Sequence, residues 1–114
     1  MEDKDQNPRR EISEYRITPA DETGRRLLCR YLERRRTEID DLRRALADQD
    51  LQLIARIGHN LRGSGSAYEL VRISQIGGRL EEAAAQPGTT ALAGIITDLE
   101  RFLDTVIVGE PNSA

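Results

Sequence analysis

The sequence has one cysteine, no tryptophan and only 4% aromatic residues. A single thiol, Cys29, allows neither a disulfide within the chain nor a cysteine-based zinc cluster, and it fits a reducing cytosol. Only three valines are present, against 13 leucines, 11 alanines and 10 isoleucines. Because strands favour β-branched and aromatic residues, this composition argues against an all-β fold and predicts an all-α one.

Long hydrophobic runs and a dominant charge are also missing. No strongly apolar run exceeds three residues, as in Val106-Ile107-Val108, so no segment is expected to span a membrane. The polar N-terminus lacks the apolar core of a signal peptide. With 17 basic and 20 acidic residues, the net charge is -3, which gives no overall field for nucleic acid or anionic lipid. We expect a cytoplasmic monomer that binds neither nucleic acid nor membrane.

Hydrophobic periodicity predicts four amphipathic helices with short connections. Thr18 is the expected N-cap of the first helix, with Pro19 at its first helical position. The polar break at residues 48–50 offers an N-cap for the second helix, and Thr89 or Thr90 caps the fourth. The expected spans are about 19–47, 51–68, 72–86 and 90–108.

These helices predict one domain, an antiparallel four-helix bundle over residues 18–108. Residues 1–17 mix charges with Asn7-Pro8 and show no period, so we expect a flexible, mobile N-terminal arm. Residues 109–114 are expected to fray. Cys29, which follows Leu28 on the first helix, is expected to be a small core-facing packing residue.

The single histidine, His59, has an informative setting. At helical spacing it shares one face with Arg62, Gly63 and Ser66. A lone helical histidine is ordinarily a satisfied or solvent-facing residue, but here the run from Gly63 to Ser66 removes side-chain bulk beside it. Such thinning suits the close approach of a macromolecule or a phosphate, and it equally suits close packing of two helices. Both readings stay open at this point.

The stretch from His59 to Tyr68 resembles the histidine-phosphotransfer (HPt) family of bacterial two-component phosphorelays. The family pattern is His, any residue, an apolar residue, Lys or Arg, Gly, small residues and an apolar or aromatic position. The matching residues are His59, Leu61, Arg62, Gly63, Ser64 and Tyr68, followed by Ile73, Leu80 and Glu81 at matching offsets. The motif covers about 25 residues, and the helical pattern extends the likeness to roughly residues 19–108.

Two positions depart from the family pattern. Arg62 replaces the family's usual lysine and keeps the charge. Glu69 stands where glycine usually follows the aromatic position, so we expect an altered turn geometry there.

The resemblance implies a phosphocarrier. His59 would accept a phosphoryl group on Nε2 from a receiver domain's phosphoaspartate and pass it to another receiver's aspartate. Arg62 would stabilise the charge on the phosphate, while Glu81 resembles the glutamate that bonds the Nδ1–H group in chemotaxis-kinase phosphotransfer domains. The partner would dock on Gly63, Ser64 and Ser66.

The same resemblance implies which partners the domain binds, and missing sequence motifs argue against ATP and metal chemistry. The partners would be receiver domains of response regulators or of hybrid histidine kinases. No ATP-binding signature is present, so we expect a carrier and not an enzyme in its own right. The chain has no metal-ligand spacing, so we expect no metal and no cofactor on it, with Mg²⁺ belonging to the partner receiver domain.

Two other functions remain open. A non-catalytic helical adaptor would dock a signalling partner on the face from Gly63 to Ser66, and it would tolerate glutamine in place of His59. An arginine-rich helix that binds nucleic acid would show a steep salt dependence of binding.

Overall fold

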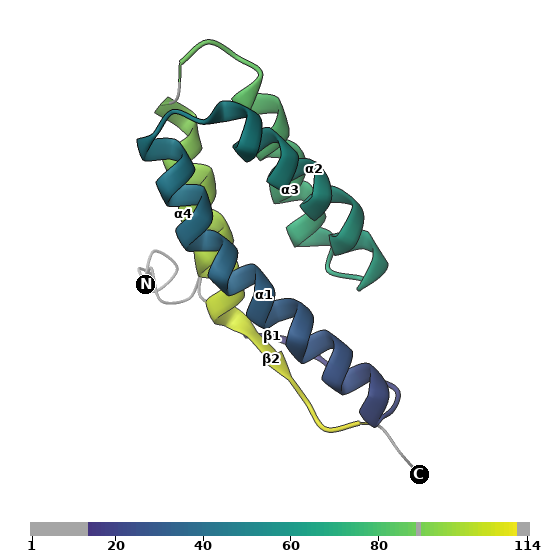
Figure 1. Cartoon of the computed structure of the whole chain (residues 1–114). Helices are drawn as coiled ribbons and strands as arrows, with labels where there is room; N and C mark the ends of the chain where they lie inside the picture. Colours follow the sequence, from purple (N-terminus) through teal and green to yellow (C-terminus); the bar gives the residue numbers. More distant parts are fainter. Residues whose placement is uncertain (1–13, 89, 112–114) are drawn as a thin grey trace, which may run out of the picture.

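The computed structural model describes residues 14–88 and 90–111 (Figure 1). Within them the chain forms four helices, which confirms the predicted all-α four-helix bundle. The helices are α1 (Glu22–Ala47), α2 (Leu51–Ala67), α3 (Val71–Ala84) and α4 (Thr90–Thr105). Two short strands, β1 (Tyr15–Ile17) and β2 (Val106–Val108), flank them. In Figure 1, α2 and α3 form one hairpin and α1 runs along α4.

The start of α1 differs from the prediction that Thr18 caps it. Asp21 is the N-cap, and its carboxylate accepts a hydrogen bond from the Gly24 amide at 2.7 Å. Thr18 follows directly on β1, where the Ile17 carbonyl accepts from the Gly109 amide at 2.8 Å and keeps the chain extended. Asp is a better N-cap residue than Thr, and the extended strand leaves Asp21, not Thr18, at the start of the helix. The N-cap of α2 lies in the predicted polar break at residues 48–50: Asp50 accepts a hydrogen bond from the Leu53 amide at 3.2 Å.

The turn after α2 has the backbone conformation that glycine ordinarily adopts at this position. The expectation of an altered turn geometry at Glu69 is therefore wrong. Glu69 has a φ of 60°, in the left-handed region. The Leu70 amide donates to the Gly65 carbonyl at 2.7 Å, and the Glu69 amide donates to the Ser66 carbonyl at 3.0 Å. This pair of bonds is the Schellman motif, formed here with a side chain at its strained position.

The strands were not predicted. β1 pairs with β2 in parallel, with Tyr15 opposite Val106, and the Tyr15 ring lies 5.3 Å from that of Phe102. The predicted N-terminal arm is therefore too long, because residues 15–17 belong to a strand. Gly109, predicted to fray, is bonded to Ile17. Of the other residues in the two predicted flexible ends, 1–13 and 112–114 lie outside the described residues.

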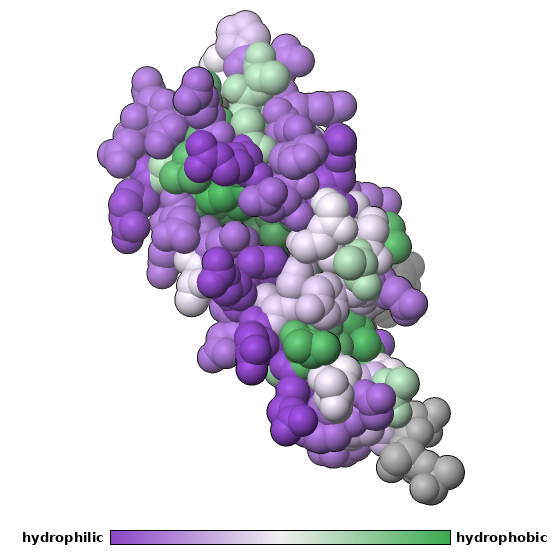
Figure 2. Space-filling model, turned by 45° about the vertical axis from the view of Figure 1, so that its right-hand side comes forward, coloured by the Kyte–Doolittle hydropathy of each residue, from purple (hydrophilic) through white to green (hydrophobic). Residues whose placement is uncertain are grey.

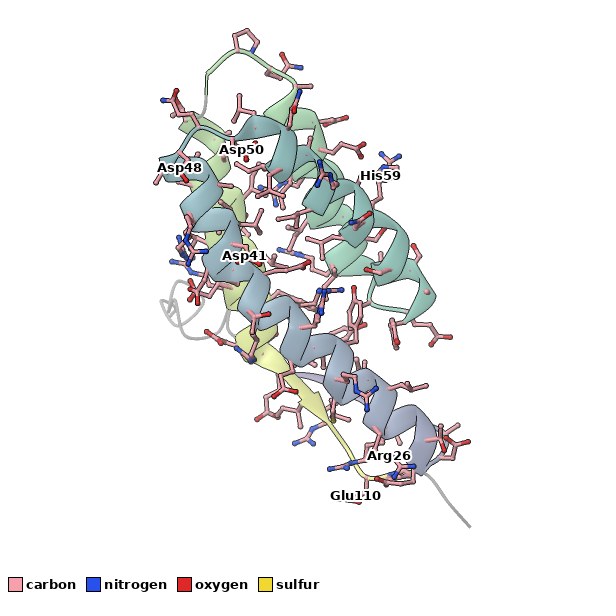
Figure 3. The ribbon with its side chains drawn as sticks, viewed as in Figure 1. Arg26, Asp41, Asp48, Asp50, His59 and Glu110 are labelled. Carbon is pink, nitrogen blue, oxygen red and sulfur yellow. The ribbon has the colours of Figure 1, made fainter. Side chains whose placement is uncertain are left out.

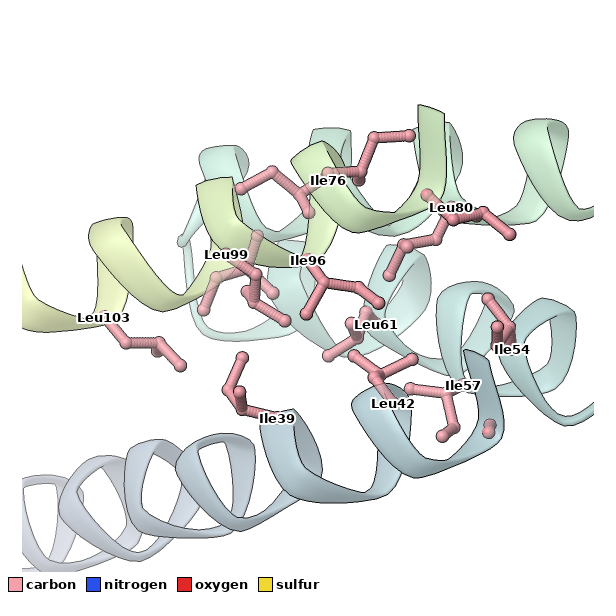
Figure 4. Packing of buried hydrophobic residues seen from close by; sticks show 14 of the residues in the cluster. Ile39, Leu42, Ile54, Ile57, Leu61, Ile76, Leu80, Ile96, Leu99 and Leu103 are labelled. Carbon is pink, nitrogen blue, oxygen red and sulfur yellow. The ribbon is translucent and has the colours of Figure 1, made fainter. Parts of the chain in front are cut away.

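Leucines and isoleucines from all four helices form one core (Figure 4). Fully buried members include Leu42, Ile54, Leu61, Ile76, Leu80, Ile96, Leu99 and Leu103. Cys29 is exposed, which contradicts its expected packing role. It follows Leu28 by one residue, or about 100° around the helix, and this rotation takes it off the core face. The face of the molecule seen in Figure 2 is largely hydrophilic.

The third helix ends at Ala84, two residues before the predicted end, and Ala85 is its C-cap. Among the described residues, no helix combines the length and apolarity needed to cross a membrane.

Candidate functional site

Two glycines bring the backbones of α2 and α3 into contact. A Cβ atom on Gly58 would lie 2.7 Å from the Gly77 carbonyl oxygen, and one on Gly77 would lie 2.6 Å from the Gly58 carbonyl oxygen. The two helices are equally close at Gly65, since a Cβ atom there would lie 2.5 Å from the Ser74 amide nitrogen. These glycines serve helix packing, and the close approach sets the residues of α3 directly beside those of α2.

Gly63 differs from the other glycines of α2. A Cβ at Gly63 would meet no atom within 4 Å. Packing therefore does not explain Gly63, which leaves bare backbone facing solvent one helical turn after His59. Close helix packing therefore explains Gly58 and Gly65, whereas Gly63 fits the close approach of a macromolecule or a phosphate.

His59 projects from α2 into solvent, with 64% of its side chain exposed (Figure 3). Its Nδ1 atom lies 3.1 Å from Oε2 of Glu81 on α3. An ionised carboxylate can only accept a hydrogen bond, so Nδ1 is the donor in this contact. The neutral ring then carries its proton on Nδ1 and keeps the lone pair of Nε2 free.

Arg62 is the cation of this site. Its Nη1 atom lies 3.3 Å from Oε1 of Glu81, so that carboxylate contacts both Arg62 and His59. The Arg62 side chain is 56% exposed and Glu81 is 32% exposed. The three predicted chemical residues therefore come together on one exposed surface.

Ser74 belongs to this arrangement, although the sequence did not single it out. Its hydroxyl donates to the Arg62 carbonyl oxygen at 2.7 Å and accepts from the Ser66 hydroxyl at 3.3 Å. It thereby ties the Arg62 backbone to α3. The only sign of Ser74 in the sequence was that a polar residue directly follows Ile73, which lies on the apolar stripe of the third helix.

The three predicted docking residues do not share one environment. Gly63 and Ser66 are exposed, as a docking face requires. Ser64 is half-buried, and its hydroxyl lies 2.7 Å from the Tyr31 hydroxyl of α1. The Tyr31 ring stacks on Tyr68 with 4.3 Å between centroids, so Ser64 belongs to the contact between α1 and α2.

Comparison with models of protein families matches residues 26–107 to the Hpt domain. The match covers all of α2, α3 and α4 and most of α1. The chain belongs to the Hpt domain family. No curated protein and no solved structure matches the chain in the corresponding comparisons.

Membership of the Hpt family gives the domain a histidine phosphotransfer role in phosphorelay signalling. Hpt domains are phosphocarriers that interact with receiver domains and kinases. Within residues 14–88 and 90–111, no group of three or more His, Cys, Asp or Glu side chains is placed to hold a metal ion.

Proposed function

We propose that this Hpt domain carries a phosphoryl group on Nε2 of His59 and exchanges it with the aspartates of receiver domains. The observation that supports the proposal is the contact between Nδ1 of His59 and Oε2 of Glu81 at 3.1 Å. This contact occupies one ring nitrogen, and the ring is exposed enough for a partner to reach the other. His59 is the only histidine in the chain.

The transfer needs no reagent besides the histidine and the phosphoaspartate. The Nε2 lone pair attacks the phosphorus of the receiver's phosphoaspartate, a P–N bond forms, and the P–O bond to the aspartate breaks. The electron pair of the broken bond stays on the aspartate carboxylate. The Nδ1 proton remains directed at Glu81, whose negative charge stabilises the ring as it becomes cationic. The reverse sequence returns the group to a second receiver.

Arg62 acts on the phosphate in this proposal. Phosphoryl transfer proceeds through a loose transition state in which charge spreads over the equatorial oxygens, so nearby cations and positioning supply most of the catalysis. Arg62 lies one turn after His59, and more than half of its side chain is exposed. The Mg²⁺ that assists the transfer would be held by the receiver domain.

The partners under this proposal are receiver domains of response regulators or hybrid histidine kinases, which the domain meets in the cytoplasm as a monomer. In this proposal the domain is a carrier that receives its phosphoryl group from a donor that is already phosphorylated.

Incubation with a panel of phosphorylated receiver domains tests the proposal. We expect a label on the chain that is lost in acid and retained in base, as for phosphohistidine. The label should leave again when an unphosphorylated receiver is added. Receivers that bind the chain without labelling it would contradict the proposal and favour the non-catalytic adaptor.

A further inference from the structure

A second arginine of α2, Arg56, lies one helical turn from His59, on the side away from Arg62. It precedes His59 by three residues, and Arg62 follows His59 by three. At 100° per residue, these steps place the two arginines about 60° to either side of His59 and about 4.5 Å to either side of it along the helix axis. All three residues are exposed, so the imidazole lies between two arginines on one open face of α2.

The two arginines differ in what they contact. Nη1 of Arg62 lies 3.3 Å from Oε1 of Glu81, so the charge of Arg62 is already paired. Arg56 forms no ion pair with any residue that the structure describes. None of its neighbours one turn away on α2 is acidic; they are Gln52, Leu53, His59 and Asn60. Arg56 therefore keeps a positive charge beside His59 that no direct contact compensates.

The charge balance around His59 favours a second cation there. The negative charge of Glu81 and the positive charge of Arg62 largely cancel at the ring, because the two groups are in contact. A phosphoryl group brings about two negative charges near neutral pH. The pair of Glu81 and Arg62 offers this group little net attraction, whereas the unpaired guanidinium of Arg56 does attract it.

Arg56 is also placed to reach a group on Nε2. Residues three apart on a helix have their Cβ atoms about 5–6 Å apart, which is within the length of an arginine side chain. Glu81 contacts both His59 and Arg62 from α3, so Arg56 lies on the side of the imidazole that α3 does not cover. Its guanidinium presents N–H groups in a planar fork, a geometry that matches phosphate oxygens.

We propose that Arg56 is a further catalytic residue, whose guanidinium donates hydrogen bonds to the phosphoryl oxygens as the group moves onto Nε2 of His59. This inference rests on the proposed function. Arg56 keeps its protons throughout, while the P–N bond forms and the P–O bond to the donor breaks. The equatorial oxygens carry the charge in the loose transition state, and Arg56 stabilises them from the side opposite Arg62.

Arg56→Gln tests this inference against a matched control. The variant loses the charge at an exposed position, so its fold should not change. Arg30 on α1 is also exposed, and Arg30→Gln changes the net charge by the same amount. Phosphoramidate is the donor, because this small molecule needs no docking surface on the chain. We expect Arg56→Gln to slow labelling about tenfold, as for the loss of one hydrogen bond to a charged group. Arg56→Lys should keep part of the rate, and Arg30→Gln all of it.

Phosphorus-31 NMR of the labelled chains separates contact with the phosphate from an indirect effect. A cation beside the phosphoryl group favours its fully ionised form and so lowers the pKa of that group. The pH dependence of the phosphorus shift should therefore give a higher phosphoryl pKa in Arg56→Gln than in wild type or Arg30→Gln.

Two results would contradict different parts of the account. A phosphoryl pKa in Arg56→Gln equal to that in Arg30→Gln would overturn the inference and leave the carrier function standing. A wild-type chain that takes label neither from phosphoramidate nor from any phosphorylated receiver would instead contradict the proposed function itself.

Discussion

Glu81 on α3 contacts the Nδ1 atom of His59 on α2 at 3.1 Å, across a helix pair whose backbones touch at Gly58 and Gly77. A side chain at either glycine would force the helices apart and withdraw the carboxylate from the ring. The packing of α2 on α3 and the orientation of the imidazole are therefore consequences of the same two glycines. The following predictions test separate parts of this relationship.

Glu81→Ala removes the acceptor for the Nδ1–H group. A hydrogen bond to a charged group is worth about 1.5 kcal/mol, so we expect phosphorylation by phosphoramidate to slow about tenfold. Nitrogen-15 NMR of the neutral ring should show the population with the proton on Nδ1 falling in the variant. Glu82→Ala, at the adjacent exposed position, is the control and should change neither quantity. An unchanged tautomer ratio in Glu81→Ala would leave Arg62 as the only charged partner of this site.

Gly63→Gln tests the open face beside His59. No atom lies within 4 Å of the added Cβ, so the helix should gain up to about 1 kcal/mol of stability from losing a glycine. Transfer from a receiver should fall strongly, because the new side chain stands where the partner approaches. Gly94→Gln is the matched control, since Gly94 is also helical and a Cβ there meets nothing within 4 Å. Wild-type transfer rates in Gly63→Gln would place the docking surface elsewhere.

Gly77 and Gly78 are neighbours on α3 for which we predict opposite effects. A Cβ at Gly77 would lie 2.6 Å from the Arg62 amide nitrogen, so backbone must move, and Gly77→Ala should cost at least about 2 kcal/mol. At Gly78 the nearest atom is 3.5 Å away, and Gly78→Ala should stabilise the domain by up to about 1 kcal/mol. Urea unfolding of both variants measures the difference. A similar loss in both would show that the helices do not meet as closely as described.

Glu69→Gly restores the residue that its left-handed backbone favours. With a φ of 60° at Glu69, the change should stabilise the domain by up to about 1 kcal/mol. The same substitution at Glu82, inside α3, should instead destabilise it by about 1 kcal/mol. Thermal unfolding of the pair checks the sign, and destabilisation by Glu69→Gly would show that the Glu69 side chain itself stabilises the turn.

The four helices could be predicted because their apolar residues repeat at helical spacing and because Asp50 marks a start. The predicted start of the first helix at Thr18 was wrong because two residues that can cap a helix, Thr18 and Asp21, lie three positions apart. The strand that decides between them was itself not predicted. That strand, β1, is three residues long and pairs with residues about 90 positions away. Neither its length nor its local pattern carries a signal, and its pairing depends on the completed bundle.

The sequence singled out residues that lie together in the structure, but it did not show how the helices around them pack. His59, Arg62 and Glu81 were all singled out, and the structure brings them together. The separate uses of Gly58, Gly63 and Gly65 could not be predicted, because the sequence does not show which glycines another backbone covers. Ser64 was grouped with its neighbours for the same reason, although its hydroxyl contacts Tyr31.

The most direct test of the central claim is label transfer from a phosphorylated receiver to wild type and to His59→Gln, measured side by side. His59 is the only histidine and is mostly exposed, so the variant should keep its helicity and melting temperature. The account predicts acid-labile, base-stable label on the wild-type chain and none on the variant. Label of that kind on His59→Gln would contradict it, because no other histidine could carry the phosphoryl group.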